Sequence, residues 1–287
     1  MLPSVRETKA LEIRGKRFAW GTRTFVMGIV NASPDSFSGD GHATPEGAIE
    51  RAVKQAASGA DMLDIGAEST RPGHTPIPSK EELRRLIPVV RGARERLPDA
   101  VISIDTFKPE VFVAACEAGG DMLNSVWGLD DELLARAAAR QVPVAIMHNK
   151  RVAVYERDVV DEVLAYLDSQ ATRAVAAGIS PERVIVDPGI GFGKTPEHNL
   201  ALLGALKRIV ALGFPTLLGT SRKSTLGKLT GRPVEERSHA TAATVALAVQ
   251  AGIDIVRVHD VAPMRDVVAV ADAIVRGWRP AGWEDTR

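Results

Sequence analysis

The chain has 287 residues, 45% of them hydrophobic, and its 36 basic side chains equal its 36 acidic ones. Net neutrality argues against a broadly basic nucleic-acid-binding surface, and no segment is apolar and long enough to span a membrane, so neither partner is expected. The single cysteine, Cys116, cannot form an intramolecular disulfide, and the N-terminus lacks a secretory signal, which together favour a cytoplasmic protein. Cys116 itself is interpreted as a small hydrophobic residue buried under a helix.

Residues 1–24 predict a short hairpin, with turns near Gly15 and Gly21. Residues 25–278 then carry eight apolar, β-branched runs that alternate with segments of helical period. A parallel strand buried on both faces has such a continuous apolar run. We therefore predict an α/β fold, a single-domain (β/α)8 TIM barrel, with the hairpin covering its floor and residues 279–287 as a tail.

Each apolar run ends abruptly in polar or charged residues. In chain order the ends are Asn31, Glu68-Ser69-Thr70-Arg71, Asp105, Asn124, His148, Asp187, Arg222-Lys223-Ser224, and Arg257 with His259. The carboxyl ends of TIM-barrel strands form the active-site face. The sequence thus directs eight sets of polar groups to one end of the barrel.

The helices between the runs have recognisable start and stop signals. Thr44-Pro45-Glu46 predicts a helix start that ends near Gly59, and Thr195-Pro196-Glu197 predicts another that continues to about Gly213. Ser79 is expected to cap the helix that follows it.

Three of the strand-end residues suit one kind of ligand. Asp105, Asn124 and Asp187 offer two carboxylates and an amide to a planar molecule with several N–H donors, because a guanidine-like edge forms parallel hydrogen bonds with a carboxylate. The alternative is that each merely caps the following loop, which is less convincing for three residues on one rim.

Two further strand ends favour an anion. The segment Ser221-Arg222-Lys223-Ser224 places cations and hydroxyls after the seventh run at a helix start, where TIM barrels often bind phosphate, although a solvated basic loop is the alternative. Arg257 and His259 alternate along the eighth run and fit a diphosphate clamp, whereas a histidine alone is more often structural. The other histidines follow no zinc-ligand spacing.

The segment D-P-G-I-G-F-G-K-T, residues 187–195, superficially resembles a phosphate-binding P-loop. The glycine that a P-loop needs five residues before Gly193 is Pro188, so we reject that interpretation. The segment is instead predicted to be a glycine-rich loop that places Phe192 near the barrel mouth.

Six segments together resemble the dihydropteroate synthase family. They are M-G-I-V-N-A-S-P-D-S-F-S, D-I-G-A-E-S-T-R-P-G, S-I-D-T-F-K-P-E-V, D-P-G-I-G-F-G-K, G-T-S-R-K-S and R-V-H-D-V, and they run from Met27 to Val261 in the order typical of the family. The resemblance implies a (β/α)8 barrel that joins 6-hydroxymethyl-7,8-dihydropterin diphosphate to p-aminobenzoate by an SN1-like displacement, releasing diphosphate and forming 7,8-dihydropteroate. It also implies Mg²⁺ as the cofactor and a homodimer as the assembly.

The same resemblance assigns roles to individual residues. The pterin would be held by Asp105, Asn124, Asp187 and Lys223 in a slot lined by Val126 and Met147. The diphosphate would be bound by Thr70, Arg257 and His259, with Asn31 at the magnesium–diphosphate. The p-aminobenzoate site would be shaped by Arg71, Pro72, Phe192 and Ser224, and Asp35 would stabilise charge on the pterin methylene.

The chain departs from the family pattern in places, and none of the departures removes a residue assigned to the substrates. Ser125 stands where many members have Asp, and the segment after the fifth run reads M-H-N-K where some have M-H-M. The rival interpretations are a pterin-binding methyltransferase barrel and a non-catalytic pterin-binding protein. Neither rival explains the S-R-K-S segment together with the two long loops that follow the first and second runs.

Overall fold

The fold is an eight-stranded parallel barrel preceded by a hairpin, in a computed structural model that describes residues 10–33, 44–68 and 76–283. The strands are β1 (Leu11–Ile13), β2 (Lys16–Phe18), β3 (Phe25–Asn31), β4 (Met62–Gly66), β5 (Val101–Asp105), β6 (Met122–Ser125), β7 (Val144–Met147), β8 (Val184–Asp187), β9 (Leu217–Leu218) and β10 (Ile255–Val258). The order is β8-β7-β6-β5-β4-β3-β10-β9, and a single parallel bridge, Val186 to Thr216, closes the ring. The predicted TIM barrel is confirmed.

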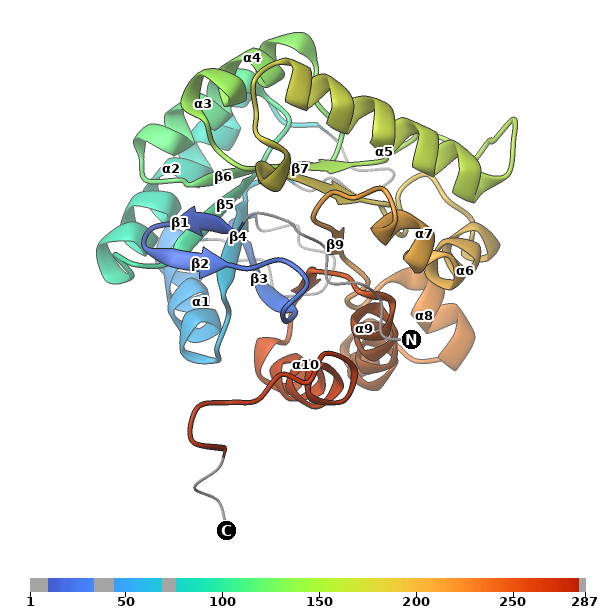
Figure 1. The fold of residues 1–287 in the computed structure, drawn as a ribbon. Coiled ribbons are helices and arrows are strands. Elements are labelled where there is room, and N and C mark those ends of the chain that lie inside the picture. Colours follow the sequence, from blue (N-terminus) through green and yellow to red (C-terminus); the bar gives the residue numbers. More distant parts are fainter. Residues whose placement is uncertain (1–9, 34–43, 69–75, 284–287) are drawn as a thin grey trace.

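Helices surround the barrel on its outer face (Figure 1). They are α1 (Pro45–Ala57), α2 (Ser79–Arg96), α3 (Pro109–Glu117), α4 (Asp131–Arg140), α5 (Val159–Ala176), α6 (Pro196–Gly204), α7 (Leu206–Val210), α8 (Ser224–Thr230), α9 (Ser238–Ala251) and α10 (Val261–Val275), with short 3-10 turns at Pro181–Arg183 and Val234–Glu236. None of the helices in the described ranges combines the length and apolar character needed to cross a membrane.

The helix signals in the sequence were right in two places and wrong in two. Thr44 and Thr195 cap α1 and α6 through their side chains. Ser79 does not cap α2: Pro78 occupies the N-cap position, and the Ser79 hydroxyl donates to Glu110 of α3 instead. The helix expected to reach Gly213 is interrupted at Ala205, next to the poor helix former Gly204, and resumes as α7.

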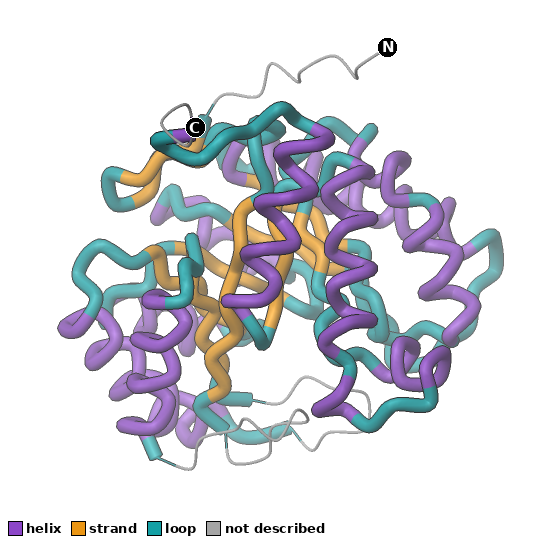
Figure 2. The backbone as a smooth tube through the Cα atoms, turned by 90° about the horizontal axis from the view of Figure 1, so that it is seen from below, coloured by secondary structure: helices purple, strands orange, loops and turns teal. Residues whose placement is uncertain are grey.

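The hairpin lies at the end of the barrel where the parallel strands begin, which is drawn at the top of Figure 2 and is called the lower end, or floor, of the barrel. The apolar side chains of the hairpin pack onto the barrel interior there. Its turn has positive φ at Arg14 (50°) and Gly15 (70°), a conformation that a two-residue hairpin loop requires. Leu11, Phe18 and Trp20 form one cluster with the first inward-facing residues of the barrel strands. The domain boundaries at residues 24 and 278 stay a prediction.

Carboxylates satisfy the backbone at this lower end. Four aspartates accept hydrogen bonds from backbone N–H groups: Asp61 from Val26 at 2.8 Å, Asp121 from Ile102 at 2.8 Å, Asp254 from Thr216 at 2.9 Å and Asp272 from Thr24 at 2.6 Å. A buried strand N–H without a partner is costly, so these side chains replace missing ladder bonds. The carboxylates at the floor of the barrel therefore stabilise the fold.

Replacing Trp20 with Ala should lower the free energy of unfolding by about 3–5 kcal/mol, the usual cost of truncating a buried aromatic side chain. Trp20 is 2% exposed and donates from its indole nitrogen to the Glu182 carbonyl at 3.1 Å. Trp283→Ala is the matched control, because Trp283 is 56% exposed and should change stability little. Urea denaturation measures both, and equal effects would contradict the packing of the hairpin.

Candidate active site

The inner face of the barrel changes from apolar to polar along the strand direction. Met62, Val101, Met122, Ile185 and Ile255 fill the lower interior with the hairpin cluster. Because alternate residues of a strand face the same side, the inward positions two residues further on are Asp64, Ser103, Asn124, Asp187 and Arg257. The upper interior thus holds charged and polar groups surrounded by apolar strands.

Arg257 is at the centre of an ion cluster in this upper interior. Its Nε donates to Asp64 Oδ2 at 2.5 Å and its Nη2 donates to Asp105 Oδ2 at 2.8 Å. Asn124 Nδ2 also donates to Asp64 Oδ2, at 2.9 Å. The second oxygen of each carboxylate, Oδ1, is buried and receives no hydrogen bond from residues 10–33, 44–68 or 76–283. These oxygens are acceptors suited to a ligand with N–H groups.

Burial and crowding shift the pKa values of this cluster. Burial, with the nearby Asp64, raises the pKa of Asp105 to about 7, despite the opposing effect of Arg257. Burial opposes the charge of Arg257, but Asp64 and Asp105 outweigh it and raise the pKa of the guanidinium. Two carboxylates around one cation leave Asp105 able to hold a proton near neutral pH, a state typical of functional sites.

Asp187 and Lys223 extend the cluster toward the barrel mouth. Gly189 N donates to Asp187 Oδ1 at 2.7 Å, and burial raises the pKa of Asp187 to about 6. Burial and the charge of Arg257 lower the pKa of Lys223 to about 8. The Lys223 ammonium lies 4.0 Å from the centre of the Phe192 ring, a cation–π contact that joins two loops predicted to meet here.

The loops after β9 and β10 are held together by side chains. His259 Nδ1 forms a hydrogen bond with the Ser221 hydroxyl at 2.9 Å, and the backbone N–H of His259 donates to the same oxygen. Arg222 has a positive φ of 57° and forms two hydrogen bonds to Asp260, at 2.7 and 3.1 Å. Arg222 is therefore a structural cation, and Lys223 is the one directed to the cluster.

The remaining predicted residues divide into two groups. Val126 and Met147 are buried directly after β6 and at the end of β7, Asn31 ends β3, and Ser224 begins α8. Asp35, Thr70, Arg71 and Pro72 lie outside the described residues.

Asp64 is the residue of the site that the sequence analysis missed. It lies inside an apolar run, M-L-D-I-G, and is fully buried. A carboxylate in the middle of a buried strand was itself the signal, since such a group almost never occurs without a partner. The sequence did not indicate that its partner is Arg257 on β10.

A half-buried lysine, also not anticipated, links the residues that flank the second long loop. Lys108 donates to the Glu68 carboxylate at 2.5 Å, to the Ile77 carbonyl at 2.6 Å and to the Glu82 carboxylate at 2.7 Å. Burial raises the pKa of Glu82. Cys116, in contrast, is as inert as expected, because burial raises the pKa of its thiol to about 12.

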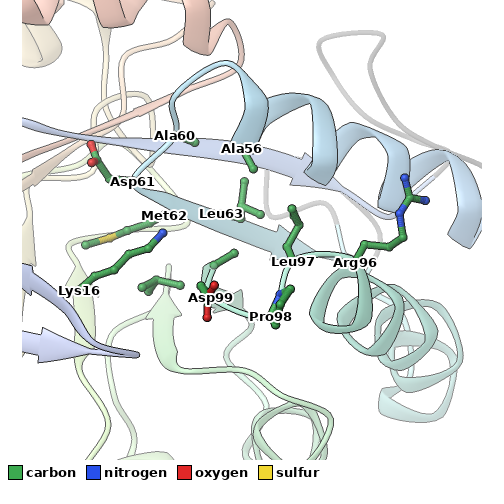
Figure 3. Close-up of a pocket in the computed structure, with 12 residues that line it drawn as sticks. Lys16, Ala56, Ala60, Asp61, Met62, Leu63, Arg96, Leu97, Pro98 and Asp99 are labelled. Carbon is green, nitrogen blue, oxygen red and sulfur yellow. The ribbon is translucent and has the colours of Figure 1, made fainter.

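A cavity of about 250 Å³ lies at the opposite end of the barrel, between the hairpin and the starts of β4 and β5 (Figure 3). Asp61 in its wall is already paired with Arg23 and Arg265, and Arg96 with Glu50. None of the predicted functional residues lines it. The barrel mouth is thus the candidate site.

The sequence pattern of the family described as "Pterin binding enzyme" matches residues 27–259. The "Dihydropteroate synthase" of Synechocystis sp. is 43% identical, over 91% of this chain and 93% of its own length. A Xanthomonas albilineans dihydropteroate synthase structure with 4-aminobenzoic acid is 44% identical, with a TM-score of 0.87 over 94% of this chain and 99% of that one. Another from the same organism, in complex with 7,8-dihydropteroate, is 41% identical, with a TM-score of 0.84 over 95% and 100%.

The barrel with polar groups at its mouth is thus that of a pterin-binding enzyme. Within that class, the chain belongs to the dihydropteroate synthase family.

Asp187→Asn should stabilise the protein at neutral pH. Since the pKa of Asp187 is raised to about 6, the folded state retains a proton that the unfolded chain releases at lower pH, so this residue's contribution to stability falls as pH rises from about 4 to 6. The uncharged amide of the Asp187→Asn variant avoids that loss. The free energy of unfolding of the variant should therefore exceed that of the wild type by up to about 3 kcal/mol at pH 7 and by almost nothing at pH 4.

Urea denaturation at a series of pH values measures this difference. Asp131→Asn, at an exposed position, is the control and should show no such pH trend. A difference between wild type and Asp187→Asn that does not vary with pH would contradict the raised pKa.

Proposed function

We propose that the mouth of this barrel condenses 6-hydroxymethyl-7,8-dihydropterin diphosphate with p-aminobenzoate, giving 7,8-dihydropteroate and diphosphate in folate biosynthesis. The activity is that of a dihydropteroate synthase, a transferase of alkyl groups other than methyl, EC 2.5.1.15. The observation that carries the mechanism is the buried cluster of Arg257 with Asp64 and Asp105, in which two carboxylate oxygens have no donor in the part of the chain that the structure describes.

The pterin is proposed to bind across this cluster. Its guanidine-like edge would donate to Asp187, and its remaining ring N–H groups to Asp105 and Asn124. Lys223, whose ammonium is buried next to these acceptors, would donate to the pterin carbonyl. Val126 and Met147 would supply the apolar walls of the slot, since both are buried at the strand ends.

The p-aminobenzoate is proposed to bind on the outer side of the pterin. Phe192, held at 4.0 Å from the Lys223 ammonium, would lie against its ring, and Ser224 would approach its carboxylate. Arg71 and Pro72 are proposed to complete this site. The amine already has a free lone pair at neutral pH, so the protein needs to orient it more than to activate it.

The diphosphate is proposed to be bound by Arg257, His259 and Thr70. Two nitrogens of Arg257 are engaged by carboxylates, so its contact with the diphosphate would come from Nη1. His259 is held in place by Ser221 for the same purpose. Neutralising the leaving group allows an SN1-like departure, and Asp35 is proposed to stabilise the resulting charge on the pterin methylene.

Magnesium is proposed as the cofactor, near Asn31. The described residues contain no cluster of three or more His, Cys, Asp or Glu side chains that fits a metal. That agrees with Mg²⁺, which commonly takes one or two protein oxygens and completes its shell with substrate phosphates and water. The carboxamide oxygen of Asn31, at the end of β3, is such a ligand. When bound, Mg²⁺ would supply positive charge to the leaving diphosphate.

A homodimer and a cytoplasmic location complete the proposal. Leu247 on α9 and Val270 and Ile274 on α10 are large apolar side chains exposed on two neighbouring helices, which supports a second copy of the chain as the partner. The single cysteine, which cannot form an intramolecular disulfide, supports a reducing compartment.

The deciding experiment measures diphosphate release with and without p-aminobenzoate. Release that requires p-aminobenzoate, with 7,8-dihydropteroate as the product, supports the proposed reaction. Pterin binding without release would identify a non-catalytic pterin-binding protein. Methyl transfer from a methylated tetrahydropterin would identify the methyltransferase alternative.

Binding should be ordered, with the pterin diphosphate and Mg²⁺ binding first and p-aminobenzoate second. The physical reason is that the sequence predicts a long loop at Arg71 and Pro72, and the placement of such a loop depends on what it contacts. Equilibrium dialysis with labelled p-aminobenzoate tests this, with a chelator as the control. Tight binding in the presence of the chelator would contradict an ordered assembly.

Asp35→Ala should reduce the single-turnover rate by about 10²–10³-fold while changing pterin diphosphate affinity little, because the carboxylate would interact with charge that exists only in the transition state. The single-turnover rate, the affinity and the melting temperature are measured on one preparation. A normal rate with a lowered melting temperature would mean that Asp35 only supports a turn beside Pro34.

A further inference from the structure

The backbone around Phe192 is held by side chains at three successive residues. Gly191 N–H donates to Asn199 Oδ1 at 2.8 Å, the Phe192 carbonyl accepts from Lys194 Nζ at 3.0 Å, and the Gly193 carbonyl accepts from the Tyr155 hydroxyl at 2.9 Å. Loops are generally more mobile than the elements they connect, so these three contacts restrain this one. The position of the Phe192 ring is therefore determined from both sides.

The glycines of this loop allow it to lie directly on the preceding loop. Gly189 and Gly193 have φ values of 69° and 57°, and a Cβ atom on them would be 2.0 Å from the His148 carbonyl and 2.2 Å from the Lys150 carbonyl. Only glycine permits that approach. The loop after β8 thus uses the backbone of the loop after β7 as its support.

Lys194 joins these two loops. Besides Phe192, its ammonium contacts the His148 carbonyl at 3.2 Å and His148 Nδ1 at 2.9 Å. Burial and the charge of Lys194 lower the pKa of His148 to about 3, so the imidazole is neutral and its Nδ1 accepts. The imidazole is fixed in turn by Tyr155 and Tyr166, whose ring centres lie 6.2 and 5.0 Å away.

The cost of burying this ammonium indicates that its placement matters. Burial, together with the charges of Lys223 and Lys150, lowers the pKa of Lys194 to about 7, although Asp187 acts in the opposite direction. An exposed lysine would keep its charge without that cost. In exchange, the buried ammonium fixes one peptide of the glycine-rich loop against the neighbouring loop.

We propose that Lys194, with Tyr155, is a positioning residue that sets the Phe192 ring beside Lys223 and thereby determines the affinity for p-aminobenzoate. This inference rests on the proposed function, in which Phe192 lies against the p-aminobenzoate ring. Lys194 itself donates to the protein and not to the substrate, so its effect passes through Phe192. Tyr155 acts on the next peptide without carrying a charge.

The test compares Lys194→Met and Tyr155→Phe with wild type. Losing the Phe192 contact should raise the KM for p-aminobenzoate about tenfold in Lys194→Met and less in Tyr155→Phe, because Lys194 Nζ has three contacts in these loops and the Tyr155 hydroxyl has one. The affinity for the pterin diphosphate, measured by calorimetry, should change less than the KM does. Lys207→Met, an exposed lysine on α7 in the same βα unit, is the control and should match wild type.

The outcomes separate the two proposals. A wild-type protein that forms no 7,8-dihydropteroate refutes the proposed function. An active wild type whose KM for p-aminobenzoate is unchanged in both variants refutes the positioning role and leaves the function intact. If Lys194→Met does not fold, Tyr155→Phe decides, and an unchanged KM in that variant overturns the inference.

Discussion

A guanidinium group stays charged at any pH a protein meets, so placing Arg257 inside a barrel obliges the fold to surround it with acceptors. Asp64 and Asp105 fulfil that requirement from β4 and β5, and Asn124 joins them from β6. Removing either carboxylate leaves a buried charge incompletely compensated, which costs more than the pair itself contributes. The cluster therefore fixes four strands relative to one another at the end of the barrel where Lys223 and Asp187 also converge.

The two ends of the barrel use the same side chain for opposite purposes. At the floor, Asp61, Asp121, Asp254 and Asp272 accept from strand N–H groups, and the carboxylates serve the fold. At the mouth, one oxygen of Asp64 and one of Asp105 are buried without a donor among the described residues. An unsatisfied buried acceptor destabilises the fold, so these two oxygens indicate where a ligand would supply the missing donors.

The sequence predicted what depends on local pattern and missed what depends on partners across the barrel. Strand ends such as Asn124 and Asp187 could be located because an apolar run stops there, and the barrel follows from eight such runs. The role of Asp64 could not, since its partner is 193 residues away on β10. Arg222 was grouped with Lys223 as a cation, although Asp260 and a left-handed backbone hold it aside. Ser79 was assigned to a cap that Pro78 occupies.

The shortest strand has a consequence for how the molecule opens. β9 has only Leu217 and Leu218, and the ring closes on its far side through the single bridge of Thr216 to Val186. Local opening of a protein begins where the fewest backbone hydrogen bonds must break. Amide protons along this line should exchange with solvent sooner than those of β3 to β5. The loop with Phe192 follows β8 and the loop with Lys223 follows β9, so these two loops lie on either side of the β8–β9 junction. Opening of this junction would therefore first change the distance between the Phe192 and Lys223 side chains.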